Sequence, residues 1–293
     1  MLKKVNIGGL VYSVSCQDNF KLNNVLESFC TEKISEDFGG ADCQLSIFKS
    51  RSKILSQKSR IKKQKYFETE AIWGLYELTD RDKILSVPSL RNGNRLRIFS
   101  EFDPNFRNGT VYISDSGWRS ITYPFLEILT IQLLALNNGV LLHACAVSVN
   151  EKGYLFVGQS GAGKSTIANL WKKGKGATIL SDDRIIVRKR DSRFWIYGTP
   201  WHGDAKVCSS EKAPLEKLFF LKHAKENSIK RLDPLDVASR LIVCSFPTFW
   251  DKKGMEFTLN FCSEIAEKIS CYELGFVPGR GIIDFLRDIY NIP

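Results

Sequence analysis

Hydrophobic and polar positions alternate in short segments over about the first 120 residues, which is the pattern of half-buried β-strands. Turn-forming pairs such as Asn92-Gly93, Asp103-Pro104 and Asn108-Gly109 separate these segments. One short helix is expected around residues 21–29. The alternating segments read KVNIGGLVYSV, DCQLSIFKS, AIWGLYEL, RLRIFSEF and TVYISD. We therefore predict a β-rich N-terminal domain over residues 1–123.

The pattern changes at residue 124, where longer apolar stretches begin. YPFLEILTIQLLALNNG predicts a buried helix from Pro124 to Leu136. GVLLHACAVSV and GYLFVG then predict two apolar strands, KSTIANLWKKG a helix that ends at Gly174, and TILSDDRIIVRK one strand carrying an acidic pair. Farther on, LEKLFFLKHA and SCYELGFVP are typical of strands, and DPLDVASRLIVCSF and GIIDFLRDIY of helices. Residues 124–293 therefore form a second domain in which strands and helices alternate.

Composition narrows the class of protein. Hydrophobic residues make up 43% of the 293 residues and charged residues 25%, the balance of a soluble globular protein. No apolar run approaches the roughly 20 residues of a membrane-spanning helix, and the N-terminus does not read as a signal peptide. We expect a cytoplasmic protein with no membrane partner. The 8 cysteines contain no CxxC pair, so we interpret them as small buried hydrophobes and not as a disulfide or zinc framework.

The formal net charge of +10 raises the question of nucleic acid. Much of the excess lies between Lys49 and Lys65, where no acidic residue interrupts the lysines and arginines. A basic run without interleaved stacking aromatics is more typical of a solvated loop or strand edge than of a reader of bases. Nucleic acid is therefore the least favoured partner, while acidic or phosphate-bearing partners stay open.

The segment from Gly158 to Ser165 reads GQSGAGKS and matches the phosphate-binding pattern G-x-x-x-x-G-K-[ST]. Glycines let consecutive backbone N–H groups turn toward a polyphosphate, and the following helix directs its positive end at the same anion. The expected nucleotide-binding residues are Gly158, Ser160, Gly161, Ala162, Gly163, Lys164, Ser165 and Thr166. ATP and Mg²⁺ are the expected cofactors.

After this loop the sequence predicts one helix and one apolar strand, and the pair Asp182-Asp183 comes at the end of that strand. One carboxylate can support Mg²⁺, as in other nucleotide-hydrolysing proteins, while the other accepts a proton from an attacking hydroxyl. The alternative for either residue is a purely structural role, capping a turn or pairing with Arg184.

These motifs together resemble a known family. His143 in LLHACAV, the loop GQSGAGKST and the SDDR of residues 181–184 are similar to the catalytic domain of HPr serine kinase/phosphorylase, whose fold is related to ATP-dependent phosphoenolpyruvate carboxykinase. The resemblance covers about residues 141–293. It implies a P-loop domain with a mixed sheet and flanking helices. Carried across by motif, it implies His143, Lys164 and Asp183 as catalytic residues and Ser165 as a Mg²⁺ ligand. With Asp183 as the base, the division of work in the acidic pair leaves Asp182 as the expected residue for the metal.

Two departures bear on the substrate. IYGTPWHGD stands where the family carries a glutamate that completes its metal site, and Asp204 is only a weak substitute. The first 120 or so residues do not resemble that enzyme's regulatory domain, so HPr itself is not the implied acceptor. His202, on the loop of this departing segment, could touch phosphate or substrate. His223, at a strand end, is expected at the surface, and Arg280 in PGRG could meet phosphate oxygens.

The leading hypothesis is a kinase that moves the ATP γ-phosphoryl group to a serine-type hydroxyl of a protein, a peptide such as a lasso precursor, or a small molecule. The N-terminal domain would select that acceptor. The alternative is a nucleotide-switched binding protein with incidental ATP hydrolysis. A carboxykinase activity would need a further set of cationic and metal-binding residues, which the sequence does not show. The acceptor, the reverse reaction and the oligomeric state, a homo-oligomer included, stay open.

Overall fold

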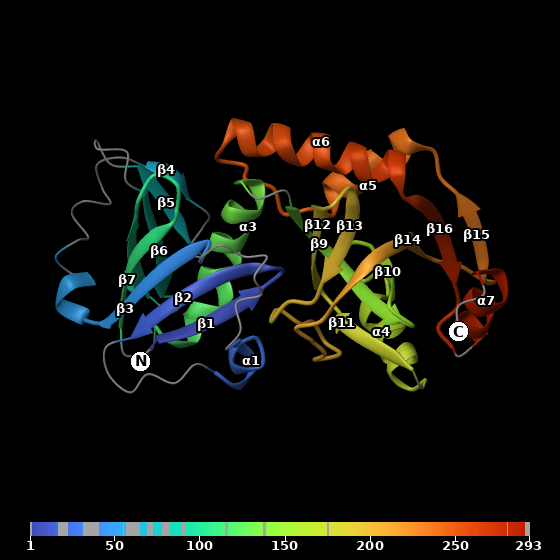
Figure 1. Ribbon diagram of the computed structural model, residues 1–293, viewed down its shortest axis with the longest axis horizontal. Coiled ribbons are helices and arrows are strands. Elements are labelled where there is room, and N and C mark those ends of the chain that lie inside the picture. The colour runs from blue at the N-terminus through green and yellow to red at the C-terminus, as the bar shows by residue number, and fades with distance from the viewer. Residues whose placement is uncertain are drawn as a thin grey trace. The chain divides into compact units, whose positions relative to one another are not determined.

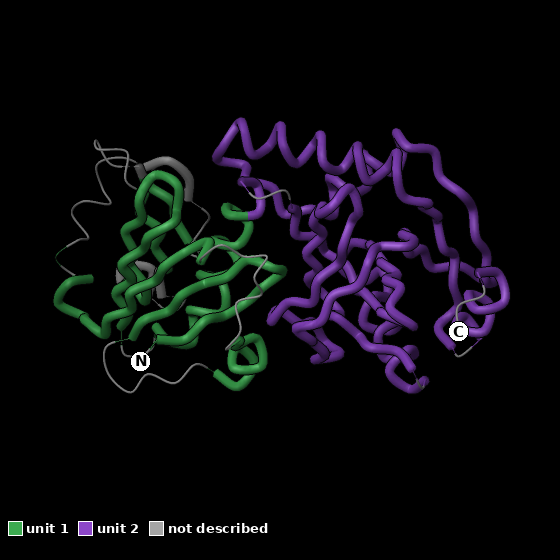
Figure 2. The backbone as a smooth tube through the Cα atoms, viewed as in Figure 1, with its two compact units in different colours: residues 1–133 green, residues 134–293 purple. Residues whose placement is uncertain are grey.

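The computed structural model divides into two compact units, Met1–Leu133 and Leu134–Pro293 (Figure 2). The division falls after Leu133, whereas the sequence analysis placed it after residue 123. The structure describes residues 2–16, 23–31, 41–54, 56, 65–68, 73–77, 83–89, 92–114, 117–136, 139–174, 176–279 and 281–290. Most of the basic run between Lys49 and Lys65, and Arg280, therefore lie outside the described residues.

Unit 1 is built on one β-sheet, in agreement with the alternating pattern. Among the described residues its strands follow the order β1-β2-β3-β8-β7-β6-β5-β4 (Figure 1). KVNIGGLVYSV forms a hairpin, because Gly8 and Gly9 take φ of 62° and 75° between β1 and β2. The elements are β1 (Leu2–Ile7), β2 (Leu10–Cys16), α1 (Asn24–Glu27), β3 (Cys43–Lys49), β4 (Lys65–Glu68), β5 (Gly74–Glu77), β6 (Lys83–Ser89), β7 (Asn92–Phe102) and β8 (Asn108–Ile113).

The predicted helix over residues 124–136 belongs mostly to unit 1. The segment η1 (Ile121–Leu126) is broken at Tyr123, whose backbone is extended (φ −142°, ψ 129°), so the helix that continues into α3 (Glu127–Leu136) begins at Pro124, as predicted. Phe125 stacks on Phe102 of β7 at 6.3 Å between ring centroids, and the Thr130 hydroxyl lies 2.7 Å from the Tyr12 hydroxyl of β2. These contacts attach the helix to the first sheet. The boundary between the two units therefore falls near the end of the helix, after Leu133.

Unit 2 contains a mixed sheet, with β10–β14 and β14–β16 parallel and the other pairs antiparallel. Its strands are β9 (Gly139–Val149), β10 (Lys152–Val157), β11 (Ala177–Ser181), β12 (Arg184–Arg190), β13 (Arg193–Tyr197), β14 (Lys212–His223), β15 (Ser228–Arg231) and β16 (Ser270–Phe276). Its helices are α4 (Lys164–Lys172), α5 (Pro234–Val243), α6 (Lys252–Lys268) and α7 (Gly281–Tyr290). Sequence patterns did not predict β15 or α6.

Helices cover both faces of this sheet, so its central strands are apolar on both sides. On β10, Leu155 and Val157 face a cluster that includes residues of α5 and α6, while Phe156 faces one that includes Trp171 of α4 and Leu286 of α7. The orange helices α5 and α6 lie side by side (Figure 1). No helix among the described residues is long and apolar enough to cross a membrane.

The segment TILSDDRIIVRK forms two strands and not the single strand that its apolar content predicts. Both β11 and β12 pair with β9, but Asp182 and Asp183 lie between them outside the strands. The Ser181 hydroxyl accepts hydrogen bonds from the backbone N–H groups of Asp183 (3.3 Å) and Arg184 (3.4 Å). Such a local side-chain acceptor offers the backbone an alternative to the strand ladder, so the chain turns here.

Candidate functional site

The candidate site lies where strand β9 changes its neighbours. His143 of β9 is opposite Arg184, its last partner in β12, and the next residue, Ala144, is opposite Val157 at the end of β10. Strands β12 and β10 lie on opposite edges of β9, and the start of β12 and the end of β10 meet at His143 and Ala144. The glycine loop follows β10 and the acidic pair precedes β12, so this register brings loop, acidic pair and histidine together at the strand ends.

The glycine loop adopts a conformation that other residues would resist. Gly161 and Gly163 have φ of 81° and 99°, in the left-handed region that favours glycine. A Cβ at Gly158 would lie 2.6 Å from the Cβ of Ala162, and one at Gly163 would overlap the ring of Phe276. The loop leads directly into α4, which begins at Lys164. The order strand, glycine turn and helix is therefore present, with the helix N-terminus available to an anion.

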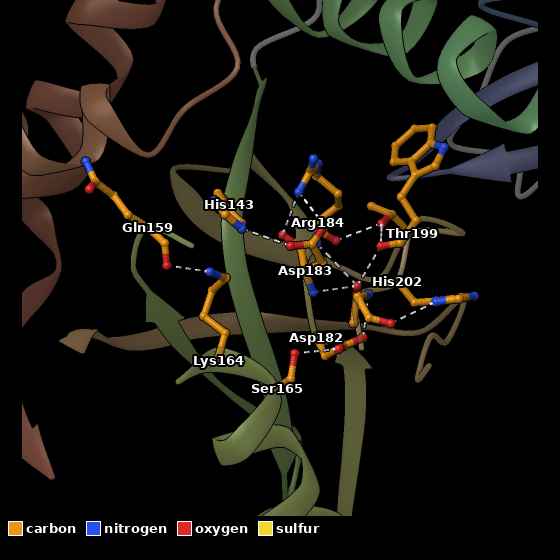
Figure 3. A network of polar contacts seen from close by, with 12 residues as sticks. His143, Gln159, Lys164, Ser165, Asp182, Asp183, Arg184, Thr199 and His202 are labelled. Carbon is orange, nitrogen blue, oxygen red and sulfur yellow. Dashed lines mark hydrogen bonds and ion pairs between the residues drawn. The ribbon is translucent and has the colours of Figure 1, made fainter. Parts of the chain in front are cut away.

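Lys164 folds back over this loop. Its Nζ donates hydrogen bonds to the carbonyl oxygens of Gly158 (2.8 Å) and Gln159 (2.9 Å), and Figure 3 shows the bond to Gln159. Lys164 is buried, and burial lowers its pKa although the charge of Asp183 opposes that change. A cation in such a site favours an anionic ligand, because its own solvation is incomplete.

Asp182 is completely buried and is held by neutral donors. Its carboxylate accepts hydrogen bonds from the Ser165 hydroxyl (2.9 Å) and from the backbone N–H groups of Gly203 (2.9 Å) and Ala205 (2.8 Å). These donors satisfy a charge that burial would otherwise make costly. A hydroxyl oxygen next to a carboxylate is also the kind of hard oxygen donor set that Mg²⁺ prefers, so Ser165 and Asp182 fit the expected ion chemically.

Asp183 has different partners from its neighbour. Its Oδ1 lies 2.9 Å from Nε2 of His143, and its Oδ2 contacts Nη1 of Arg184. Burial alone would raise the pKa of Asp183, but the hydrogen bond from His143 and the positive charge of Arg184 outweigh burial and lower that pKa. The carboxylate is therefore ionised at neutral pH. Because a quarter of the side chain is exposed (25%), it is open to a ligand, unlike that of Asp182.

Phe246 contacts both partners of Asp183. The Arg184 guanidinium lies over the Phe246 ring at 4.3 Å, and the His143 ring is 6.3 Å away from it. The chain that carries Phe246 follows α5 and bonds to β9, since the N–H of Phe246 donates to the carbonyl of Leu141 at 2.9 Å. Sequence reasoning missed this residue, because nothing local distinguishes it from other core aromatics.

The segment GTPWHG, which departs from the family pattern, wraps around Asp182. A Cβ at Gly203 would lie 2.9 Å from Oδ2 of Asp182, so glycine permits this close approach. The Thr199 hydroxyl donates to the carbonyl of Arg184 at 2.7 Å. Nδ1 of His202 lies 3.2 Å from the carbonyl of its neighbour Gly203, and the imidazole is exposed. The two glycines of the segment, Gly198 and Gly203, were a signal for such a turn that the sequence analysis did not use.

A pocket of about 400 Å³ lies at the meeting point of these elements. Gly203 and the exposed Asp204 contribute to its lining, whereas Gly158, Ala162 and Asp182 are not part of it. Within the described part of the chain, no group of three His, Cys, Asp or Glu side chains has the geometry of a metal site. The pocket brings together His143, Ser160, Gly161, Gly163, Lys164, Ser165, Thr166 and Asp183, all of which the sequence predicted as site residues.

The remaining candidates lie around this pocket or away from it. His223 is exposed, and its ring also reaches the glycine loop, with Nε2 2.8 Å from the carbonyl oxygen of Gly161. Its position at the carboxyl end of a strand parallel to β10 was a signal that sequence reasoning did not use. All 8 cysteines are free thiols; Cys145 and Cys244 are buried near the loop, and burial raises their pKa.

Comparison with known proteins finds only a distant structural likeness. No family model matches the chain, and no curated protein matches it. A solved structure of the HPr(Ser) kinase/phosphatase from Coxiella burnetii aligns with 10% sequence identity and a TM-score of 0.31, covering 52% of this chain and 88% of that chain. At this TM-score the likeness carries no argument about fold or activity.

Proposed function

We propose that the protein is an ATP-dependent kinase that transfers the γ-phosphoryl group to a serine-type hydroxyl. One observation carries the proposal. Asp183, an ionised and partly exposed carboxylate, lines the same pocket as Lys164 and Ser165 of the glycine loop and α4. Phosphoryl transfer requires these parts together: a site for polyphosphate, cationic and oxygen groups near it, and a base for the attacking hydroxyl.

The nucleotide side of the site is assigned to the loop and to α4. The N–H groups of the loop and of the first turn of α4 would bind the β- and γ-phosphates, with Lys164 exchanging its carbonyl partners for phosphate oxygens. The Ser165 oxygen would hold Mg²⁺, and the buried Asp182 carboxylate would support that ion through its hydrogen bond with the Ser165 hydroxyl. The ion would supply positive charge to the transferring phosphoryl group. The backbone donors from Gly203 and Ala205 keep the Asp182 carboxylate oriented for that role.

The acceptor side is assigned to Asp183. The acceptor oxygen would form its bond to the γ-phosphorus while the bond to the leaving oxygen of ADP breaks, and the hydroxyl proton would pass to Asp183. His143 and Arg184 orient this carboxylate from either side. A loose transition state leaves the hydroxyl proton in place until late in the transfer, so a base whose pKa is lowered is sufficient.

A nucleotide-switched binding protein is the second candidate, and one observation favours it. Both oxygens of Asp183 already have partners, His143 and Arg184. If these ion pairs persist when nucleotide binds, Asp183 has a structural role and ATP hydrolysis is incidental. The two candidates differ in whether loss of the carboxylate charge affects chemistry or nucleotide affinity.

The test separates the two aspartates. Asp183→Asn is expected to retain Mg-ATP binding in calorimetry and to lose phosphoryl transfer by at least about a hundredfold, the usual scale for a general base. Asp182→Asn is expected to raise the Mg²⁺ concentration needed for binding. Transfer is measured with radiolabelled ATP against free serine, small proteins and peptides, including lasso-type precursor peptides. Equal loss of ATP affinity in both variants would favour the switch protein instead.

A further inference from the structure

Strand β14 extends beyond the end of β10 and supports the glycine loop that follows β10. Strand β14 is parallel to both β10 and β16, and Phe220 is its last residue paired with β10, opposite Val157. The next three residues of β14 pair only with β16, ending with His223 opposite Phe276. The end of β14 therefore continues beside the loop at the point where β10 stops.

His223 bonds to the loop with a defined direction. Its Nε2 lies 2.8 Å from the carbonyl oxygen of Gly161. A carbonyl can only accept, so Nε2 must carry a proton, and both the neutral Nε2–H tautomer and the imidazolium satisfy this bond. The contact therefore does not depend on the protonation of the ring.

A second contact joins the same histidine to the other left-handed glycine. The rings of His223 and Phe276 stack with centroids 5.8 Å apart and planes at 29°. The Phe276 ring in turn occupies the space that a Cβ of Gly163 would need. Gly161 and Gly163, with φ of 81° and 99°, are thus supported by one stack of two side chains from β14 and β16.

We propose that His223 is a positioning residue that holds the Gly161 carbonyl outward, so that the loop is ordered for phosphate before nucleotide arrives. The nucleotide part of this inference rests on the proposed function. Loop amides can face an anion only if their carbonyls point away from it, and an outward carbonyl needs a partner to stay fixed. His223 does not line the pocket, so it acts through the loop and does not touch the ligand. Ordering the loop in advance reduces the entropy that nucleotide binding would otherwise cost.

Two variants test whether the hydrogen bond of His223, and not only the volume of its side chain, orders the loop. His223→Leu removes the donor, while His223→Gln places an amide N–H the same number of bonds from Cβ as Nε2 of histidine. We expect His223→Leu to raise the Kd for Mg-ATP about two- to tenfold, the effect of one hydrogen bond, and His223→Gln to restore most of the affinity. Because His223 is exposed, both variants are expected to unfold at the wild-type temperature.

A neighbouring residue provides the matched control. Lys222 precedes His223, and its Nζ bonds to Glu273 at 3.2 Å. Lys222→Gln removes a positive charge from the same strand end without touching the Gly161 carbonyl, so its affinity for Mg-ATP should equal that of the wild type. Equal weakening by Lys222→Gln and His223→Leu would show an effect of charge at the strand end and would overturn the inference.

Hydrogen exchange without ligand tests the loop directly. Amides of residues 159–163 should exchange faster in His223→Leu than in the wild type, and at the wild-type rate in His223→Gln. Unchanged exchange, or faster exchange with unchanged Mg-ATP affinity, would overturn the inference. A wild-type protein that binds no Mg-ATP would refute the proposed function and the nucleotide part of the inference, while exchange would still decide whether His223 orders the loop.

Discussion

The two neighbouring aspartates show how position decides the chemistry of one residue type. Asp182 is fully buried and satisfied by a hydroxyl and backbone N–H groups, whereas Asp183 is partly exposed and lies between a histidine and an arginine. The turn between β11 and β12 directs one carboxylate to α4 and the GTPWHG segment and the other to the pocket. This difference supports the proposed division between metal support and proton acceptance.

Lys164 offers a test of charge against packing. Lys164→Met keeps the apolar stem of the side chain and removes the ammonium group. We expect phosphoryl transfer to fall by on the order of a hundredfold or more, because the lost charge faces the developing charge of the transferring group. The folded structure should persist, as judged by thermal unfolding.

Lys172→Met is the control, because Lys172 lies at the exposed end of the same helix. It should leave transfer unchanged. Transfer by Lys164→Met at the wild-type rate would contradict the role of the loop in binding phosphate.

At the scale of elements, regular patterns predicted most strands and helices, and packing decided the rest. The helix over DPLDVASRLIVCSF occurs as α5, and the Asp233 carboxylate caps it by accepting from the N–H groups of Leu235 and Asp236. Helix α6 was not predicted, although Phe261, Cys262 and Ile265 recur at helical spacing on its buried face. A glycine in its first turn, Gly254, obscures the helix in the sequence.

The two left-handed glycines of the loop should respond differently to the same substitution. At Gly161 a Cβ would have nothing within 4 Å, so Gly161→Ala meets only backbone strain of about 1 kcal/mol. At Gly163 the Cβ would also overlap the Phe276 ring. We expect Gly163→Ala to lower the free energy of unfolding by about 1–3 kcal/mol more than Gly161→Ala does, measured by urea unfolding. Equal losses would show that Phe276 moves aside freely.

An ion-pair cluster between α5 and β16 predicts a pH-dependent loss of stability. The charges and hydrogen bonds of Arg240 and Lys222 lower the pKa of Glu273 below its usual value near 4.5. A carboxylate with a lowered pKa stabilises the fold above its unfolded pKa, and this contribution disappears as the pH falls through the folded pKa.

Glu273→Gln should therefore lower the free energy of unfolding at pH 7 by less than about 1 kcal/mol, because the partners are partly exposed. The difference from the wild type should vanish as the pH falls through the lowered folded-state pKa of Glu273. Urea titrations at several pH values measure it. A difference that stays constant from neutral to acidic pH would show that the effect comes from packing and not from charge.

At the scale of the whole molecule, the described catalytic candidates all belong to unit 2, and helix α3 belongs mostly to unit 1. The role of unit 1 in selecting an acceptor remains a proposal, since most of the basic run that suggested it lies outside the described residues. What the structure adds is a better place to separate the two units.

Two fragments test that division. A fragment of residues 134–293 should fold and bind Mg-ATP with the affinity of the full chain, because the loop, the acidic pair and His143 lie within it. A fragment of residues 125–293 should aggregate more, since it exposes the apolar residues Phe125, Leu129 and Leu133, which are buried in the full chain. Size-exclusion chromatography and calorimetry compare them. Lost binding by the shorter fragment would show that unit 1 contributes to the nucleotide site.

The features that the amino-acid sequence determined by itself depend on interactions between residues close together in the chain. The strand, glycine loop and helix around Gly163 depend on φ preferences and helix-terminus geometry within a few residues, so the pattern alone predicted them. The tertiary structure decided what depends on register across the sheet. The partnership of His143 with Asp183 follows from the register of β12 on β9, which sets Arg184 opposite His143. The contact of His223 with Gly161 follows from the extra length of β14 beyond β10. Residues 40 and 62 positions apart meet there because strand pairing aligns them, and no local preference encodes such alignment.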